Sequence, residues 1–249
     1  RGFDVVVFDK RDEIGGNLHV AKKPPFKGKF EWAIDYYKSM AKKLNITMKL
    51  GKEVTAQEVL ALKPYSILVA TGSNVISIPL EGLDQVQTVQ AHDVLANDMQ
   101  FANKKVVVIG GGITGLETAL YINRQGTNQV SVVDMLPEWP VDMLDMRYQN
   151  EALLEVRHCN DQGVALFYNN KVVKFADGKL FIESTKDGEV KELPADVIVL
   201  SVGVKPNDAL WQELLASGHP SVWKAGDAIA TGKINKAVLH GSKFGYSLN

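Results

Sequence analysis

The sequence predicts an α/β fold built from parallel β-α-β units, and three observations favour it. An apolar run at 106–109 leads directly into a glycine-rich turn and then into a helix-like segment. Two short β-branched runs, at 4–10 and 129–135, contain an acidic residue where each predicted strand ends. Helix-like and strand-like segments alternate along the chain, as in a parallel sheet covered by helices.

The first half of the chain contains four predicted elements after the opening run. They are an amphipathic helix at 30–45, a strand at 46–50, a helix at 55–63 and a buried strand at 65–72. Thr55 followed by Glu58 three residues later predicts a capping box at the start of the second helix. A loop with Pro79 and Gly82 then precedes the next β-α-β unit.

The second half begins with a strand, a glycine turn and a helix over 104–126, with Gly126 ending the helix. Residues 164–183 alternate apolar and polar positions around Asp177-Gly178, which predicts an antiparallel hairpin. The remaining predicted elements are a strand at 195–203, a helix near 208–217 and a final strand leading into VWKAGDA at 222–228.

Composition limits the possible functions. The 249 residues carry 28 Lys and Arg against 29 Asp and Glu, so the formal charge of -1 argues against nucleic acid as a partner. The single cysteine, Cys159, excludes an internal disulfide or CxxC pair and favours a reducing, cytoplasmic setting. No apolar run is long enough to span a bilayer, so no membrane association is expected. Because RGFDVVVFDK opens almost directly into a strand, we expect a truncated chain.

The segment GGGITG gives the most specific motif. Gly110, Gly112 and Gly115 have the G-x-G-x-x-G spacing between a strand and a helix. In this context the first glycine makes the tight turn, the second lets the backbone approach a pyrophosphate, and the third lets the helix pack closely. The helix N-terminus attracts the negative charge. The predicted cofactor-binding residues of this turn are Gly110, Gly111, Gly112, Ile113, Thr114 and Gly115.

Asp134 ends the next strand, 19 residues after Gly115, close to the spacing of about 20 expected for an acid that binds the cofactor ribose. Its carboxylate accepts hydrogen bonds from ribose hydroxyls of NAD and repels the extra phosphate of NADP. Met135 follows it where an arginine could have bound that phosphate. These residues predict a preference for NADH. The alternative is a purely structural turn with a surface acid beside it.

A second, scattered set of residues surrounds this fingerprint. It comprises Asp9, Gly15, Gly16, Thr71, Gly72, Gly226 and Asp227. Together the two sets resemble the two-dinucleotide-binding flavoproteins, in which an NAD(P)H domain is inserted within an FAD domain. That resemblance implies a nested Rossmann-like architecture. It also implies that Asp9 binds the adenosine ribose of FAD and that Asp227 lies beside its ribityl-phosphate portion.

The chain is more closely similar to the C-terminal region of NADH:flavin oxidoreductases related to old yellow enzyme. That group includes 2,4-dienoyl-CoA reductase, enoate reductases and trimethylamine dehydrogenase. FDKRDEIGGNL, KPP, ILVATG, VVVIGGGITGLETA and LSVGVKPN carry the resemblance, the last adding Gly203 to the cofactor-binding set. It implies an FAD-type domain at 1–100, an inserted NAD(P)H-binding domain at 101–204 and a second FAD-type part at 205–249.

In this family a flavin-bearing barrel with FMN and an iron-sulfur cluster lies upstream, so that barrel is the expected partner domain of the same parent chain. The first FAD-side strand, with its own glycine turn, is expected immediately before RGFDVVV and is absent from the sequence. We therefore expect an N-terminally incomplete FAD-type domain with weak or no FAD retention. A homo-oligomer is possible on sequence grounds.

The predicted function is hydride transfer from NADH to FAD, with onward transfer to the FMN and iron-sulfur barrel. The cofactors supply the chemistry, so no catalytic acid, base, nucleophile or metal ligand is predicted. One alternative is a non-catalytic module that holds ADP, as in trimethylamine dehydrogenase-like proteins. A disulfide reductase is disfavoured because the chain contains no CxxC. The terminal substrate could be an enoate, a dienoyl thioester or an amine.

Several other residues are expected to be structural. The lysines of AKKPPFKGK predict a solvated loop, and the five histidines have no metal-ligand spacing. Cys159 is expected at a helix end. Trp32, Tyr36 and Tyr37 are expected to pack in the core or along the face of their helix.

Overall fold

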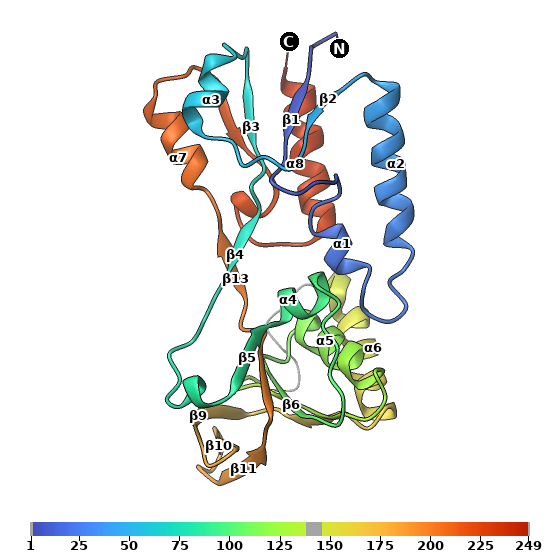
Figure 1. The fold of residues 1–249 in the computed structure, drawn as a ribbon, viewed down its shortest axis with the longest axis vertical. Coiled ribbons are helices and arrows are strands. Elements are labelled where there is room, and N and C mark those ends of the chain that lie inside the picture. Colours follow the sequence, from blue (N-terminus) through green and yellow to red (C-terminus); the bar gives the residue numbers. More distant parts are fainter. Residues whose placement is uncertain (1, 138–145, 249) are drawn as a thin grey trace. The chain divides into compact units, whose positions relative to one another are not determined.

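The helices and strands of the computed structural model, which describes residues 2–137 and 146–248, fall into two units (Figure 1). Unit 1 comprises residues 1–16, 35–76 and 203–249, and unit 2 comprises residues 17–34 and 77–202. Helix α2 (Phe30–Lys43) crosses the boundary between the two sets of residues. The predicted limits of the FAD-type and NAD(P)H-binding domains, at residues 100 and 204, remain a prediction, because this division into two units does not test them.

Unit 2 is organised around a parallel sheet in the order β5-β12-β6-β7-β8. Its strands are β5 (Gln87–Gln90), β6 (Lys105–Ile109), β7 (Gln129–Val133), β8 (Ala165–Phe167) and β12 (Val197–Leu200). β6 from Val106 onward and the whole of β12 are continuous apolar runs, as expected of strands covered on both faces. This arrangement confirms the predicted parallel α/β fold.

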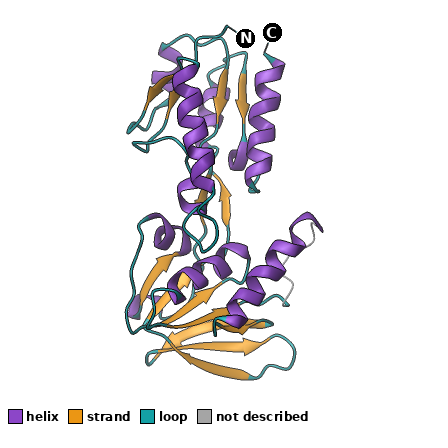
Figure 2. Cartoon of the chain, turned by 90° about the vertical axis from the view of Figure 1, so that its right-hand side faces the viewer, coloured by secondary structure: helices purple, strands orange, loops and turns teal. Residues whose placement is uncertain are grey.

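The two faces of this sheet have different covers. Val106 and Val108 point into a core shared with Leu120, whereas Val107 and Ile109 point into a second core on the opposite face. Three helices cover the first face, namely α4 (Ala91–Ala96), α5 (Ile113–Asn123) and α6 (Met146–Asp161). An antiparallel sheet of β9 (Asn170–Ala176), β10 (Lys179–Ser184) and β11 (Val190–Pro194) covers the second (Figure 2).

The hairpin predicted at Asp177-Gly178 joins β9 to β10 in the antiparallel sheet. Asp177 has φ 52° and Gly178 has φ 73°, the left-handed pair that a two-residue hairpin turn needs. The other elements of the described part of unit 2 are the short helix α1 (Leu18–Ala21) and the 3₁₀ turn η1 (Leu83–Gln85). The helix predicted to end at Gly126 ends earlier, at Asn123.

Unit 1 contains three separate strand pairs. β1 (Val6–Phe8) pairs with β2 (Thr47–Lys49) and β3 (Ile67–Val69) with β14 (Val222–Lys224), both in parallel. β4 (Ser73–Val75) pairs with β13 (Val204–Pro206) in antiparallel fashion. The remaining elements are α3 (Ala56–Ala61), α7 (Ala209–Ala216), the 3₁₀ turn η3 (Gly226–Ala228) and α8 (Ile234–Ser247).

The predicted capping box is confirmed at the start of α3. Thr55 Oγ1 accepts from the backbone N–H of Glu58 at 3.3 Å, and Glu58 Oε2 accepts from the backbone N–H of Thr55 at 2.9 Å. These contacts satisfy two backbone donors that a helix N-terminus leaves without intrahelical partners. No helix among the described residues is long and apolar enough to cross a membrane.

Of the two positions expected for the aromatic residues of α2, the core and the helix face, the structure shows the helix face. Ile34 is the helix residue that the fold buries, whereas Trp32 is 68% exposed and Tyr36 is 58% exposed. The side chain of Lys29 lies over the Trp32 ring, with Nζ 5.7 Å from its centroid. Helical spacing identified the helix, but it could not select the buried face because apolar residues occur on more than one side.

Candidate nucleotide-binding sites

The glycine turn lies at the carboxyl end of β6, where α5 begins. Gly110 follows the strand with φ 109°, a conformation that L side chains rarely adopt. Gly112 is the N-cap residue of α5, and no side chain caps this helix. The first turn of α5 contains no acidic residue. The helix N-terminus therefore offers its backbone N–H groups and partial positive charge to an anion.

Two of the predicted glycines are required by close backbone contacts. A Cβ on Gly115 would lie 1.9 Å from the carbonyl oxygen of Gly110, so α5 could not pack against the turn. A Cβ on Gly110 would lie 2.2 Å from the carbonyl oxygen of Ser201, which follows β12. Any larger residue would displace the backbone that forms the cradle, so the turn fits a dinucleotide pyrophosphate.

Asp134 is joined directly to this turn. Its Oδ2 accepts from the backbone N–H of Gly111 at 2.6 Å, and its Oδ1 accepts from the backbone N–H of Leu136 at 2.8 Å. β6 and β7 are neighbouring parallel strands, so their carboxyl ends meet at one edge of the sheet. The structure therefore brings together the glycine turn and the acid that the sequence paired by spacing alone.

Two residues beside the turn were missed by the sequence analysis. Ser201 contacts the turn through its backbone, and Tyr168 lies so close that a Cβ on Gly111 would be 2.9 Å from Tyr168 Cε1. Ser201 immediately follows β12, which pairs with β6, and its sequence signal was its place in the segment LSVGVKPN, two residues before Gly203. Gly203 has φ 100°, and its carbonyl accepts from the backbone N–H of Ile76 at 3.1 Å in unit 1.

In unit 1, Asp9 directly follows β1. Its Oδ1 accepts from the backbone N–H of Arg11 at 2.9 Å, and its own N–H donates to the carbonyl of Lys49 at 3.2 Å. Gly15 and Gly16 have φ 126° and 53°, so the loop after Asp9 uses conformations that favour glycine. Asp9 therefore occupies in unit 1 the strand-end position that Asp134 occupies in unit 2.

The other predicted residues of unit 1 gather where β3 and β14 end. Ser73 Oγ donates to Asp227 Oδ2 at 3.3 Å, which links the segment after Thr71 and Gly72 to the one after Gly226. Thr71 donates its hydroxyl to the carbonyl of Asn207, and the N–H of Gly226 donates to His240 Nδ1 at 3.2 Å. Parallel pairing of β3 with β14 makes these ends adjacent. Ser73 and His240 were not predicted.

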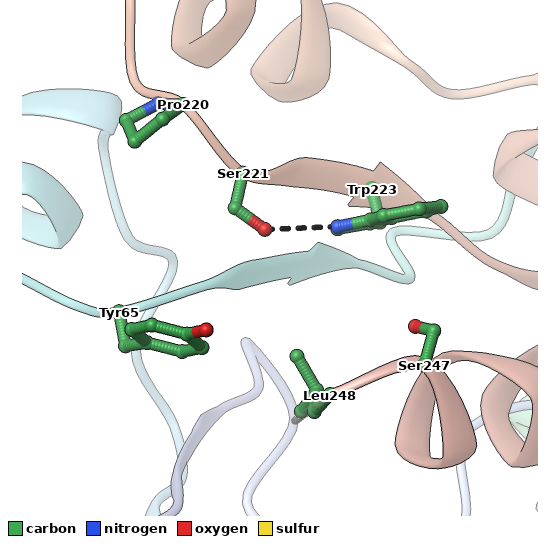
Figure 3. A pocket seen from close by; sticks show the side chains of 6 residues that line it. All are labelled: Tyr65, Pro220, Ser221, Trp223, Ser247 and Leu248. Carbon is green, nitrogen blue, oxygen red and sulfur yellow. Dashed lines mark hydrogen bonds between the residues drawn. The ribbon is translucent and has the colours of Figure 1, made fainter.

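A cavity of about 300 Å³ lies at the opposite ends of the same two strands (Figure 3). Its lining residues are Tyr65, Pro220, Ser221, Trp223, Ser247 and Leu248. Trp223 Nε1 donates to Ser221 Oγ at 2.9 Å, so the indole nitrogen already has an acceptor. Ligands of parallel α/β sheets bind at the carboxyl ends of strands, which separates this cavity from the candidate sites.

The single thiol does not belong to either site. Cys159 is fully buried in α6 and packs in the core beneath α5. Burial raises the pKa of its thiol to about 12, with the charge of Glu155 adding to the effect. A thiol with this pKa is protonated at neutral pH and is a poor nucleophile. The structural role expected for Cys159 agrees with its burial.

Residues 34–239 match the family described as pyridine nucleotide-disulphide oxidoreductase. The chain is 33% identical over 207 residues to a bilirubin reductase of Mediterraneibacter gnavus, covering 83% of this chain and 31% of that protein. It is 30% identical over 256 residues to an NADH oxidase of Thermoanaerobacter brockii, covering 100% of this chain and 38% of that protein. The chain thus spans 31% and 38% of the lengths of these relatives.

A solved structure of 2-naphthoyl-CoA reductase in complex with 2-naphthoyl-CoA is similar over the whole chain. The TM-score is 0.89 at 28% sequence identity, and the match covers 100% of this chain and 37% of that chain. The similarity, together with the family match, confirms the predicted Rossmann-like FAD/NAD-binding fold.

Proposed function

We propose, from the premise that this chain belongs to the pyridine nucleotide-disulphide oxidoreductase family, that unit 2 binds NADH and delivers hydride to an FAD bound by unit 1. The family is one of oxidoreductases that use FAD and NAD(P). The proposed role of this chain is that of a nucleotide-binding part within a longer flavin oxidoreductase. The lengths of the relatives, of which the chain spans 31% and 38%, support a longer parent.

The observation that carries the proposal is the contact between the glycine turn and Asp134. The Gly111 N–H and Asp134 Oδ2, 2.6 Å apart, hold the carboxylate beside the N-terminus of α5. A dinucleotide with its pyrophosphate at that N-terminus would place its adenosine ribose within reach of the acid. Ile113 and Thr114, the first two residues of α5, lie at the same end of the helix.

The same acid supports a preference for NADH over NADPH. The Asp134 carboxylate accepts hydrogen bonds from ribose hydroxyls and repels a 2′-phosphate. Met135 beside it is 61% exposed and supplies no positive charge. A phosphate at this position would lack a counter-charge from either residue.

FAD is proposed to bind weakly to unit 1. Asp9, Gly15, Gly16, Thr71, Gly72, Gly226 and Asp227 are the proposed contacts. Among the described residues, however, β1–β2 and β3–β14 form separate two-stranded sheets, and no strand pairs with both. The centre of a parallel sheet is where a dinucleotide-binding glycine turn is expected. Flanking contacts alone give FAD no pyrophosphate cradle.

The electrons are proposed to pass onward to an FMN and iron-sulfur barrel elsewhere in the parent protein. This chain has one cysteine, and that residue is buried, so it contains no dithiol that could accept electrons from FAD. The relative with bound naphthoyl-CoA makes an unsaturated acyl thioester one candidate final acceptor, alongside an enoate or an amine. A reducing compartment such as the cytoplasm suits this chemistry.

The test is a fluorescence titration with NADH and NADPH of the wild-type chain and two matched variants. Asp134→Asn removes the negative charge and one acceptor oxygen from the proposed ribose contact, and it should raise the Kd for NADH about tenfold, the effect of losing a charged hydrogen bond. Asp9→Asn changes the corresponding acid of unit 1 and should leave the Kd unchanged. Absence of NADH binding to the wild-type chain would overturn the proposal.

The flavin part is tested separately by the absorption spectrum of the purified chain. Weak binding predicts that flavin is lost during gel filtration and must be added back for NADH-dependent dye reduction. Stoichiometric flavin that survives gel filtration would contradict the proposed weak retention. NADH binding without dye reduction at saturating FAD would favour the alternative of a non-catalytic nucleotide-binding module.

A further inference from the structure

The loop between α1 and α2 is fastened to the helices of unit 2 (Figure 1). We call residues 22–31 the strap. Lys23 Nζ lies 2.5 Å from Asp98 Oδ2, just after α4, and Lys22 Nζ lies 2.5 Å from Glu31 Oε2 within the strap itself. The expectation of a solvated loop is therefore wrong for these two lysines, because Lys23 pairs with a carboxylate distant in the sequence and Lys22 with one nine residues away.

Lys27 makes the most buried of these contacts. Its Nζ lies 2.8 Å from Glu117 Oε1 on α5 and 2.5 Å from Glu151 Oε1 on α6. A third carboxylate, that of Glu155 on α6, lies 4.0 Å away. The Lys27 side chain is 18% exposed and that of Glu117 is 13% exposed. One ammonium group thus bridges the glycine-turn helix to its neighbour in a largely desolvated position.

Phe26, the residue before Lys27, has an unfavourable backbone conformation, which indicates that contacts with other residues hold the strap in place. Phe26 has φ 68°, which is unfavourable for a bulky L residue. Its ring lies 4.9 Å from the His158 ring and 4.5 Å from the guanidinium carbon of Arg124. Arg124 caps the C-terminus of α5 and His158 belongs to α6, so Phe26 contacts the same two helices as Lys27.

The carboxylates around Lys27 make the contact of the strap with α5 and α6 sensitive to the loss of the Lys27 charge. Burial raises the pKa of Glu117, and the hydrogen bond from Lys27 only partly offsets that effect. Burial also acts against the charge of Lys27, yet its hydrogen bonds to Glu117 and Glu151 hold its pKa above the ordinary range. Without Lys27, the carboxylates of Glu117, Glu151 and Glu155 would have no cation from the strap to pair with.

We propose that Lys27 is a positioning residue that couples the strap to the dinucleotide site through α5. Glu117 lies in the same helix as the glycine turn, two residues after Gly115, and a helix of 11 residues moves as a rigid element. Fixing Glu117 therefore restricts the N-terminus that faces the pyrophosphate. This inference rests on the proposed NADH site. The added claim is that NADH binding orders the strap and that an ordered strap raises the affinity for NADH, because thermodynamic linkage is reciprocal.

The test measures NADH affinity and hydrogen exchange of the strap amides together. Lys27→Met should raise the Kd for NADH about tenfold, within the usual range for coupled sites, and should abolish any slowing of strap exchange by NADH. Lys27→Arg keeps the charge and should restore both. Lys22→Met, which removes the pair with Glu31 inside the strap, is the matched control and should bind NADH normally.

The variant Lys27→Met/Glu117→Gln/Glu151→Gln guards against misfolding, because it removes the lysine together with two of its carboxylates. It should fold, by circular dichroism and thermal melting, and still bind NADH weakly. Wild-type affinity in this variant or in Lys27→Met would overturn the coupling while leaving the NADH site intact. A wild-type chain that binds no NADH would instead contradict the proposed function, and the coupling with it.

Discussion

Units 1 and 2 share a plan but differ at the centre of their sheets. In each unit one parallel strand is followed by an acid, β7 by Asp134 and β1 by Asp9. In unit 2, β6 lies between β7 and β12. In the described part of unit 1, β1 and β3 belong to separate two-stranded pairs, and neither has a counterpart of β6 beside it.

Burial follows this difference closely. Val132 and Val133 of β7 are 1% and 0% exposed, whereas Val6 and Val7 of β1 are 41% and 36% exposed. The two strands have similar β-branched sequences, so composition does not explain the contrast. A parallel strand is buried when neighbouring strands and covering layers occupy both its edges and both its faces. The comparison teaches that the local sequence makes the strand, while its neighbours decide whether it forms a core.

The largest expected effect comes from the glycine cradle of unit 2. Gly115→Ala puts a Cβ 1.9 Å from the carbonyl of Gly110 and should destabilise unit 2 by about 3 kcal/mol, the upper end for overpacking. It should also abolish measurable NADH binding. In unit 1, Gly72→Ala meets no atom within 4 Å of the added Cβ, so it strains only the local backbone, where φ is 74°, and should leave NADH binding unchanged. Urea unfolding and NADH titration of both variants test the contrast, and equal NADH affinities would contradict it.

A pair of valine truncations tests the burial difference directly. Val108→Ala in β6, at 0% exposure, should lower the free energy of unfolding by about 2 kcal/mol through lost burial and cavity formation. Val6→Ala in β1 should lower it by less than about 0.5 kcal/mol, as for most surface substitutions. Denaturant midpoints provide the measurement. A Val6 variant as damaging as the Val108 variant would mean that β1 is covered in solution.

The smallest expected effect concerns Glu58 and Glu155, whose contributions to the free energy of unfolding should change with pH in opposite directions. The hydrogen bond from Lys52 lowers the pKa of Glu58 in unit 1 to about 2, so its stabilising contribution is present above 4.5 and is lost as the pH falls toward 2. Burial raises the pKa of Glu155 in unit 2, so its contribution is present at low pH and is lost as the pH rises through that folded-state pKa.

Glu58→Gln should therefore reduce stability at neutral pH and have little effect in strong acid. Glu155→Gln should increase stability at neutral pH, since it removes the cost of ionising a buried carboxyl. Urea midpoints measured across the acid range distinguish the two slopes. Parallel pH profiles for the two variants would show that burial does not separate these carboxyl groups.

Local sequence patterns predicted the features that depend on residues close together in the chain. Periodicity located α2 and the capping box at Thr55, and glycine spacing located the turn between β6 and α5. The distance from Gly115 to Asp134 anticipated their proximity, because one helix and one strand of ordinary length separate them. These predictions succeeded because backbone conformation and short-range hydrogen bonding are set locally.

Contacts between residues distant in the sequence became visible in the tertiary structure alone. It placed Ser201 and Tyr168 against the glycine turn, exposed Trp32, and directed Lys27 to carboxylates about 90 and 120 residues further along the chain. It also showed that the strap packs with unit 2 and that the strands of unit 1 form separate pairs. No local sequence pattern predicts such contacts, because they form only when segments distant in the sequence pack together and bury their side chains.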